Sequence, residues 1–453
     1  MKPATNFNIA LMQVLNKGKK YALNKDLNGG FGTADDYGDS FISKLISLVK
    51  WRAVRIPIIG MAFLQALLKE KGNQVKYYEG DLPSAEEQFD LMLIYGSIVD
   101  CHHENAVASQ LKKDFPSARI GFFGTFPSRF PEVFSSADFV LSGEAEAFFM
   151  NDFNSLDQLT GVVKVSSLTD IEALPTPDFT GFPVHKYSYF PCLSKRPFVS
   201  LLASKGCPYS CKYYCTYGEY QGPKIRQRSA KKVVDDILHV QQKYGVKSVQ
   251  FRDPVFGLVK TFIPQFCEEL KSRGVKINWG METRLDLLNE GLIKMMFGVG
   301  LRNINVGIET KIPEVAEKNK RLLIKEPHQE KIIQFCSKLG VKISAFYILA
   351  YEGDTRETIR ETINYAKKLN TNVARFSVST PFPGTGFYLQ LEQEGRILTK
   401  DWEKYTLHNL VYKHQNFSPQ QVKELLGTAF KEYYFRPRYA LQMLQWRIRE
   451  LWL

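Results

Sequence analysis

The chain has 453 residues, enough for two or three domains that each have a hydrophobic core of their own. Its 44% of hydrophobic and 24% of charged residues are ordinary for a globular protein. The most apolar stretch, residues 56–68, is too short to span a bilayer and contains Pro57 and Gly60, so no membrane-spanning helix is expected.

The net charge is +13, from 60 basic and 47 acidic residues, and such an excess can attract phosphates, nucleic acid or an anionic membrane surface. The sequence has no long block of basic residues, so we expect a solvated basic surface and no nucleic-acid partner. Residues 435–453 alternate arginines with Tyr, Leu and Trp at helical spacing. This pattern predicts a terminal helix that docks on the protein itself, and peripheral contact with a membrane or a lipid is the alternative.

The cysteines are few and unevenly distributed. Seven are present, and three of them lie within one short loop. A disulfide framework is therefore not expected, and the predicted location is the reducing cytoplasm.

Residues 1–150 alternate short apolar runs with amphipathic helices. "FNIALMQVL", "QVKYYEG" and "DLMLIYGS" indicate strands, and "GMAFLQALLKEKG" indicates a helix between the first two. This order predicts a doubly wound, Rossmann-like domain with a parallel sheet, whose ligands bind at the carboxyl ends of the strands. Residues 151–195 contain Pro and Gly punctuation, as in "LPTPDFTGFP", and are expected to form a linker.

Residues 196–385 repeat the alternation of strand and helix. Six strands and five helices are expected, which indicates a partial (β/α)6 barrel of the TIM type. Residues 386–453 have mainly helical periodicity, and Ser418 and Pro419 are placed as the N-cap and first-turn residues of a helix that ends near Tyr434. The predicted fold class is α/β, with a Rossmann-like domain, a partial barrel and a helical C-terminal extension.

The stretch "GCPYSCKYYC" places Cys207, Cys211 and Cys215 on one loop after the first barrel strand, where the mouth of such a barrel collects its chemistry. Three closely spaced thiolates suit an iron–sulfur cluster, and three ligands for a four-iron cube leave one iron open to substrate. Zinc is the competing metal, because Cys192 would complete the four ligands of a structural zinc site. Unliganded structural cysteines are disfavoured, because the loop is polar and rich in tyrosine.

On these residues the sequence resembles the radical S-adenosylmethionine (radical SAM) superfamily, and in particular its cobalamin-binding branch, over most of the chain. Cys207, Cys211 and Cys215 match the three cluster ligands of that superfamily. The last gap between the cysteines holds three residues instead of the usual two. The resemblance places a tyrosine beside the adenine of S-adenosylmethionine (SAM), and Tyr214 is the expected residue.

Motifs at the ends of later strands agree with this resemblance. "FRDPVF" contains Asp253 and "GIET" contains Glu309, and the resemblance implies that both act in catalysis and in SAM binding. "METR" contains Glu282 and Arg284, which would bind the methionine end of SAM, an arginine being suited to a carboxylate. "TPFPGT" at the end of the sixth strand matches the motif of the cobalamin-binding branch. "LAYEGDT" at the fifth strand departs from the usual motif of that branch. Each of these residues also has a purely structural interpretation, as a helix N-cap or a surface ion pair.

The same resemblance implies that the Rossmann-like domain holds the corrin of cobalamin on its strand ends, facing the barrel. Gly96, Ser97 and Gly124 follow predicted strands and would approach the corrin or its nucleotide tail. "SGEAEAFF", which contains Glu144, resembles the acidic turn that closes this domain. The histidines of "DCHHEN" are interpreted as the polar start of a helix and not as cobalt ligands.

These assignments imply an enzyme in which the cluster passes one electron to SAM, and the resulting 5'-deoxyadenosyl radical takes a hydrogen atom from an unactivated carbon. If methylcobalamin sits above the barrel, the product is C-methylated, so a cobalamin-dependent methyltransferase is the main prediction. A radical cyclase or another rearrangement without methyl transfer is one alternative, and a non-catalytic cobalamin- or metal-binding protein is another. The expected partners are a small-molecule or lipid substrate and an electron donor such as flavodoxin or ferredoxin.

Overall fold

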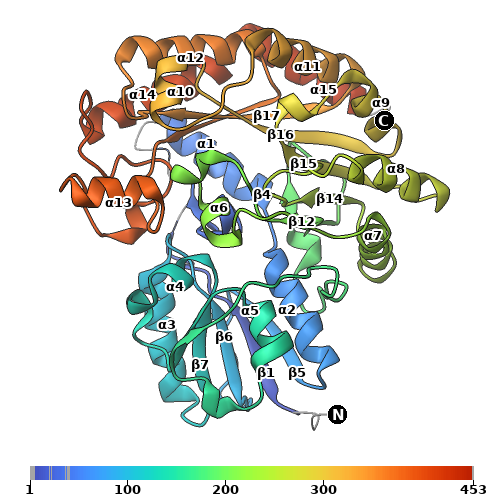
Figure 1. Ribbon diagram of the computed structural model, residues 1–453, viewed down its shortest axis with the longest axis vertical. Coiled ribbons are helices and arrows are strands. Elements are labelled where there is room, and N and C mark those ends of the chain that lie inside the picture. Colours follow the sequence, from blue (N-terminus) through green and yellow to red (C-terminus); the bar gives the residue numbers. More distant parts are fainter. Residues whose placement is uncertain (1–5, 20, 22, 36, 38–40, 451–453) are drawn as a thin grey trace.

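The computed structural model describes residues 6–19, 21, 23–35, 37 and 41–450, which form two lobes (Figure 1). Each lobe is built around one six-stranded parallel sheet, and the C-terminal helices lie along the second lobe. The predicted α/β fold class, a Rossmann-like domain followed by a partial barrel and a helical extension, is confirmed. Within the described residues, no helix has the length and apolar character needed to cross a membrane.

The first sheet has the strand order β5-β1-β6-β7-β8-β9. Alternate residues of its central strands pack against α2 on one face and α3 on the other, as expected for a parallel sheet that is covered on both faces. The elements are β1 (Asn8–Gln13), α2 (Ile59–Glu70), β5 (Gln74–Glu79), β6 (Leu91–Tyr95), α3 (Cys101–Asp114), β7 (Arg119–Phe123), α4 (Thr125–Arg129), β8 (Phe139–Ser142), α5 (Ala145–Ala147) and β9 (Gly161–Lys164).

Strand β9 was not expected, because it lies within the predicted linker, residues 151–195. It pairs in parallel with β8, with Phe139 opposite Gly161. Its four residues are mostly exposed and form no apolar run. An edge strand has only one neighbouring strand, so its sequence needs no alternation of apolar residues. Part of the predicted linker therefore belongs to the first sheet.

The second sheet has the unbroken order β11-β14-β15-β16-β17-β18, and its two edge strands do not pair with each other within the described residues. The barrel is therefore open on one side. Its elements are β11 (Phe198–Leu201), α7 (Ala230–Tyr244), β14 (Ser248–Phe251), α8 (Phe262–Ser272), β15 (Asn278–Thr283), α9 (Glu290–Gly298), β16 (Leu301–Glu309), α11 (Glu326–Leu339), β17 (Lys342–Leu349), α12 (Arg356–Leu369) and β18 (Val373–Val378).

The C-terminal extension consists mainly of α13 (Gly386–Gln393), α14 (Pro419–Tyr434) and α15 (Pro437–Glu450). The Ser418 side chain accepts a hydrogen bond from the Gln421 N–H, and the Gln421 side chain accepts one from the Ser418 N–H. This capping box confirms the predicted start of α14. Helix α15 packs against α14, as predicted for the terminal helix, and residues 451–453 lie outside the described residues.

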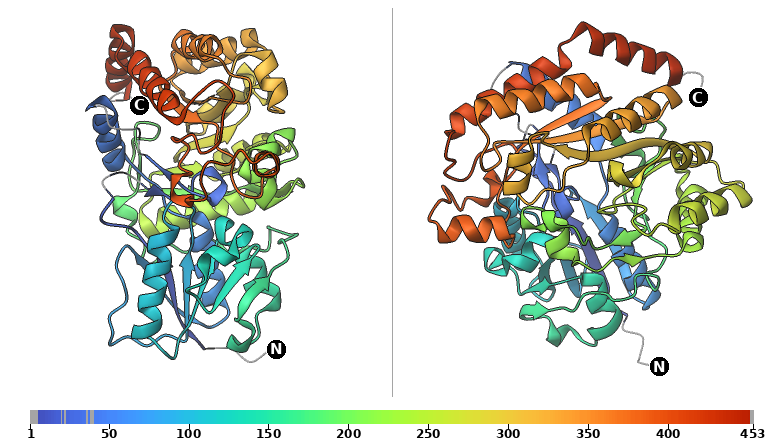
Figure 2. Two further views of the ribbon diagram at one scale, coloured as in Figure 1. Left: turned by 90° about the vertical axis from the view of Figure 1, so that its left-hand side faces the viewer. Right: turned by 45° about the horizontal axis from the view of Figure 1, so that its top comes forward.

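The residues between β1 and α2, which we call the crossover segment (residues 14–58), leave the first lobe and return to it. Within the segment lie β2 (Leu23–Asn24), η1 (Asn28–Gly30), β3 (Thr33–Ala34), α1 (Phe41–Ala53) and β4 (Val54–Arg55). Strand β4 pairs with β10 (Ser188–Tyr189), and α1 packs against α14. Figure 2 accordingly shows the blue α1 beside the C-terminal helices of the second lobe. The sequence analysis did not predict this excursion.

The η1 turn lies between the two lobes. The hydroxyl groups of Thr125 and Tyr95, at the strand ends of the first sheet, donate to the carbonyl oxygens of Gly29 (2.7 Å) and Gly30 (3.0 Å). Both glycines have positive φ, and a Cβ on Gly29 would lie 2.6 Å from Oγ1 of Thr216, which follows the cysteine loop. Only glycine therefore allows this approach of the two lobes.

The crossover segment is anchored to the first lobe by Lys25, whose side chain is fully buried. Its Nζ lies 2.5 Å from a Glu104 carboxylate oxygen and 3.1 Å from Asp100, and it also donates to the Val14 carbonyl. Both carboxylates come from the start of α3 and are fully buried as well. A buried ion pair of this kind is costly to break, because the partner charge stays uncompensated.

Replacing Lys25 by Met should therefore lower the free energy of unfolding by about 3–5 kcal/mol, measured by urea denaturation. Lys17→Met is the matched control, because the side chains of Lys17 and its partner Asp81 are 71% and 82% exposed. That exposed pair should contribute at most about 1 kcal/mol. Equal losses in the two variants would show that the buried group does not anchor the segment.

Candidate active site

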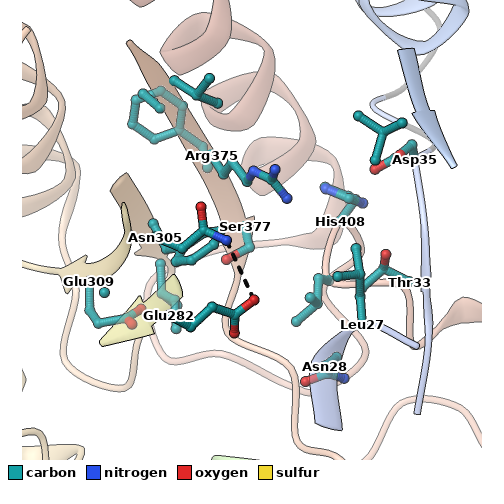
Figure 3. A pocket seen from close by; sticks show the side chains of 18 of the residues that line it. Leu27, Asn28, Thr33, Asp35, Glu282, Asn305, Glu309, Arg375, Ser377 and His408 are labelled. Atoms are coloured by element: carbon teal, nitrogen blue, oxygen red, sulfur yellow. Dashed lines mark hydrogen bonds between the residues drawn. The ribbon is translucent and has the colours of Figure 1, made fainter. Parts of the chain in front are cut away.

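A cavity of about 620 Å³ runs from the cysteine loop through the barrel interior to the crossover segment, and Figure 3 shows its part between the barrel strands and that segment. Cys192 lines its wall, and so do seven residues predicted to bind the cluster or SAM. Strand ends of the barrel, the cysteine loop and the crossover segment all contribute to it. The seven are Cys207, Cys211, Tyr214, Cys215, Glu282, Arg284 and Glu309.

The cysteine loop is shaped by one glycine and one short helical turn. Gly206 has φ +92°, and a Cβ there would lie 2.1 Å from the Lys224 carbonyl oxygen. The turn η6 (Ser210–Tyr213) follows, and the Cys211 carbonyl accepts hydrogen bonds from the N–H groups of Tyr214 (3.1 Å) and Cys215 (2.9 Å). These bonds turn the three cysteines toward the same cavity.

The spacing of the thiols distinguishes between the two metals under consideration. The three Sγ atoms do not all lie within 4.8 Å of one another, since the one such group of ligand atoms in the described residues is elsewhere, at Cys101. Ligands of a single zinc ion, at about 2.3 Å from it, would be roughly 3.8 Å apart. Cys192, the proposed fourth zinc ligand, has its Sγ 3.1 Å from the Ser344 hydroxyl. The geometry therefore suits a larger centre better than one zinc ion.

Among the three cysteines of the loop, the surroundings favour a thiolate at Cys211. A hydrogen bond from the Cys215 thiol is the main cause that lowers the pKa of Cys211 to about 6, although burial opposes it. The guanidinium groups of Arg321 and Arg284 add to the lowering. The same hydrogen bond raises the pKa of Cys215, and burial raises that of Cys207. Thiolates are the form in which cysteine binds metals, so Cys211 is the thiol most readily prepared for ligation.

Arg284 and Glu282 line the same cavity but have different protein partners. The Arg284 guanidinium stacks over the Tyr209 ring at 4.4 Å and forms an ion pair with Asp286 at 2.9 Å. Glu282 forms a close ion pair with Arg252, and Asn305 Nδ2 lies 3.4 Å from its carboxylate, the contact drawn in Figure 3. The two residues therefore do not bind each other, and each presents a charge to the cavity.

Glu309 ends β16 at a position where the pairing with β17 shifts in register. Its φ of 69° turns the side chain toward the cavity, and a Cβ on Gly307 would lie 2.3 Å from its Oε1. Burial raises the pKa of Glu309 to about 7, and the charge of Arg321 opposes this rise. Burial also raises the pKa of Tyr214, with the Glu309 charge as the second cause. Glu309 and Tyr214 thus line the same cavity and lie close enough to influence each other's charge.

Asp253 lies outside the lining of this cavity. Its carboxylate accepts hydrogen bonds from the Ala203 N–H (2.9 Å) and the Ser204 hydroxyl (2.6 Å), and it is 1% exposed. Successive residues at a strand end point to opposite sides, and here Arg252 faces the cavity. Asp253 therefore supports the chain that leads into the cysteine loop.

The three residues expected to approach a corrin, and Glu144 of the turn that closes the domain, are mostly engaged elsewhere. Ser97 donates from its N–H and hydroxyl to Glu104, and Glu144 forms a buried ion pair with Arg226 at 2.7 Å. A Cβ on Gly96 would overlap Pro127. Gly124 lines a second cavity of about 100 Å³ between the lobes, beneath the η1 turn.

The histidines of "DCHHEN" lie at the start of α3, as interpreted from the sequence. His102 is exposed, and its Nε2 lies 3.5 Å from Asp401 in the C-terminal extension. Neither histidine lines the two cavities.

Several cavity residues were missed by the sequence analysis. The crossover segment supplies Asn28, Asp35 and Lys50, and the barrel supplies Arg321 and Arg375. For the residues of the crossover segment, one feature of the sequence could have indicated a functional role. The Gly- and Asp-rich stretch "NKDLNGGFGTADDYG" has no strand or helix periodicity, and it is too rich in charge for a simple loop.

Comparison with known proteins identifies the second lobe. Residues 201–366, from β11 into α12, match the family model of the Radical SAM superfamily. The second lobe therefore contains a radical SAM domain. The resemblance predicted from the cysteine loop is thereby confirmed.

This radical SAM protein is 25% identical over 418 residues to an uncharacterized methyltransferase of Pyrococcus horikoshii, covering 85% of this chain and 89% of the relative. It is 25% identical over 354 residues to the anaerobic magnesium-protoporphyrin IX monomethyl ester cyclase of Rubrivivax gelatinosus, covering 72% and 62%. It is 22% identical over 285 residues to the bacteriochlorophyllide d C-12(1)-methyltransferase of Chlorobaculum tepidum, covering 61% and 59%. The chain thus spans about three fifths of the length of the last two relatives.

Two solved structures share the fold of this radical SAM protein. The radical SAM methyltransferase TsrM from Kitasatospora setae, with cobalamin and a [4Fe-4S] cluster bound, has a TM-score of 0.62 at 14% identity, covering 86% of this chain and 78% of TsrM. The cobalamin-dependent enzyme OxsB, with aqua-cobalamin and SAM bound, has a TM-score of 0.65 at 13% identity, covering 98% and 71%. The likeness includes both lobes and therefore shows a shared two-domain fold.

The support that Asp253 gives to the loop should be visible as a pH dependence of stability. Burial raises the pKa of Asp253 to about 6, so the folded state binds this proton more tightly than the unfolded state, where the value is 3.8. The free energy of unfolding of the wild type should therefore fall by about 2 kcal/mol, relative to Asp253→Asn, as the pH rises from about 4 to about 6. Chemical denaturation of both proteins across this range measures the difference, and parallel curves would contradict the prediction.

Proposed function

We propose that this protein is a radical SAM enzyme that holds a [4Fe–4S] cluster on Cys207, Cys211 and Cys215. The observation that supports the proposal is that these cysteines share one cavity with the carboxylates and the guanidinium at the ends of β15 and β16. Three ligands from one loop leave one iron of a four-iron cube open to SAM.

When bound, the reduced cluster supplies one electron to SAM, whose cleavage gives methionine and a 5'-deoxyadenosyl radical that abstracts hydrogen from the substrate. The residues of the chain bind and orient SAM. Arg284, held in place by Tyr209, is suited to the methionine carboxylate. Glu309, once ionised, can accept from the ammonium group or the ribose, and Tyr214, in the same cavity, can cover the adenine. Asp253 acts through the loop and not on SAM.

We propose C-methylation of an unactivated carbon as the outcome of the radical reaction. The names of the relatives support it, since the Pyrococcus protein is described as a methyltransferase and the Chlorobaculum enzyme methylates bacteriochlorophyllide d. The cyclase of Rubrivivax gelatinosus supports the second candidate, a radical cyclisation without methyl transfer. In both cases the substrate is a small molecule that enters the cavity of about 620 Å³.

Cobalamin is named for both solved structures that share the fold, and it is the methyl carrier that this comparison supports. The strand ends of the first lobe do not fit a corrin as they stand, because η1 covers them. The cavity that remains there, about 100 Å³, has room for only a few water molecules at about 30 Å³ each. A corrin would bind here only after the crossover segment had left the strand ends.

An electron donor is required, and a flavodoxin or ferredoxin is the class that we propose. All seven cysteines are free thiols, which supports the reducing cytoplasm as the location.

The first test is the formation of 5'-deoxyadenosine, measured by mass spectrometry after anaerobic reconstitution with iron and sulfide and incubation with SAM and dithionite. The wild type should form it, and a variant with Ala at positions 207, 211 and 215 should lose both the iron and the product. The matched control replaces Cys267 and Cys336 by Ala, because both are buried on barrel helices away from the cavity. That control should keep the cluster absorbance and the activity.

Two outcomes would contradict the proposal. A full cluster in the wild type with no 5'-deoxyadenosine would favour a binding or regulatory protein. Retention of the cluster in the triple variant would mean that other residues are its ligands.

A further inference from the structure

Two helices at the open side of the barrel carry most of the exposed large apolar side chains. Eight of the fourteen such side chains in the described residues lie on α1, on α15 or at the end of α14. Their exposed fractions range from 43% to 59%. We call these eight the apolar face: Leu45, Leu48, Val49, Trp51, Phe435, Leu441, Leu444 and Ile448.

Helices α1 and α15 lie on the same side of the molecule, and both pack against α14 (Figure 2). On α15 the exposed residues Leu441, Leu444 and Ile448 recur at helical spacing, so they form one stripe. The opposite side of α15 carries the buried Trp446. Monomeric proteins seldom expose a contiguous apolar patch of this kind unless it contacts a partner or a membrane.

The apolar face adjoins the active-site cavity. Leu45 and Val49 of α1 are exposed to solvent and also line the cavity. Tyr439 and Met443 of α15 line it from the other helix. The route from the surface to the cysteine loop therefore passes between apolar side chains of α1 and α15.

The charges around this face are positive. Lys44 and Arg52 on α1 and Arg438 and Arg447 on α15 are exposed, and α1 contains no acidic residue. The whole chain carries a net charge of +13. Two apolar helices with basic residues on their exposed surface are typical of binding at an anionic membrane interface.

Inside the mouth lies a guanidinium with no carboxylate partner among the described residues. Arg375 of β18 is held between the rings of Tyr189 and Phe346, each 5.4 Å away, and donates to the Tyr189 hydroxyl at 2.9 Å. Its Nε is buried and has no hydrogen-bond partner. The neighbouring Lys50 is paired with Asp35 at 2.7 Å, so one positive charge is left over in this part of the cavity. Figure 3 shows the Arg375 guanidinium directed into the pocket.

We propose that the apolar face docks on an anionic lipid bilayer and that the substrate is an amphiphile with an acidic head group drawn from it. The head group enters the cavity and binds Arg375, and the apolar part of the molecule stays between α1 and α15 at the mouth. A half-buried arginine without a carboxylate partner suits a carboxylate or phosphate, because a charge without a counter-ion in an apolar site is costly until an anion compensates it. The substrate part of this inference rests on the proposed function.

A second copy of the chain is a poorer occupant of this face. Pairing the face with itself would bring the same four basic residues of each copy together, with no acidic side chain on α1 to compensate them. Anionic phospholipid head groups complement the same charges. The exposure of Trp51 among lysine and arginine residues also agrees with an interfacial position.

Co-sedimentation of the full chain with vesicles tests the docking. Vesicles of phosphatidylcholine alone are compared with vesicles that contain phosphatidylglycerol as well. The wild type should bind the anionic vesicles at least about tenfold more strongly, and Leu48→Glu combined with Leu444→Glu should reduce this binding at least about tenfold, since each leucine then loses its apolar contact. Neither leucine lines the cavity.

The matched control is Leu82→Glu combined with Leu398→Glu, because these leucines are 46% and 51% exposed and lie away from α1 and α15. It should bind vesicles as the wild type does. An equal loss in the control, or no vesicle binding by the wild type, would overturn the docking. A wild-type dimer in light scattering that the Leu48/Leu444 variant dissociates would also overturn it, in favour of a second copy.

The head-group site is tested with a fluorescent fatty acid, 11-(dansylamino)undecanoic acid, and its neutral primary amide. The acid should bind at least about tenfold more tightly than the amide, and Arg375→Met should remove this preference while Arg375→Lys retains part of it. Equal affinities for the acid and the amide would overturn the site. Both binding assays are independent of SAM cleavage, so absence of 5'-deoxyadenosine contradicts only the proposed function, and absence of lipid binding contradicts only this inference.

Discussion

The Arg252 guanidinium holds three distant parts of the chain at one point. It forms ion pairs with Asp26 of the crossover segment and with Glu282 of the barrel, and it approaches the hydroxyl of Tyr217, which follows the cysteine loop. All these groups are largely buried, and burial raises the pKa of Asp26 to about 6 despite the arginine. Removal of one partner would leave the charges of the others buried and uncompensated. The cavity wall, the cysteine loop and the crossover segment therefore depend on each other for stability.

The regular elements of both lobes follow from local patterns in the sequence. The six barrel strands alternate with helices in a regular order along the sequence, and the capping residue Ser418 specifies the start of α14 within one turn. The crossover segment has no such pattern, because its strands β2 and β4 have two residues each, and β4 pairs with the distant β10. Strand β9 was missed for the same reason, since an edge strand of four mostly exposed residues carries no apolar alternation.

The candidate site was predicted in part, and the position of Asp253 outside the cavity lining has a geometric cause. A strand-end position fixes the edge of the sheet at which a residue lies, and it does not fix the side to which the residue points. Arg252 and Asp253 are neighbours at the end of β14, and the cavity receives Arg252 whereas Asp253 turns toward Ala203. The basic groups Lys50 and Arg375 come together only through the excursion of α1, so no motif within either lobe indicates them.

The open side of the barrel also determines when the site can form during protein synthesis. The Ala34 carbonyl of the crossover segment is hydrogen bonded to His408, which is 374 residues further along the chain. At about 5–20 residues per second, a ribosome needs roughly 20–75 s to bridge that interval. During this time α1 emerges without α14, its partner in the finished protein, and its row of apolar side chains is available to chaperones or to a membrane surface. The first lobe is thus translated early but reaches its final structure late, because its crossover segment packs against C-terminal helices that are translated last.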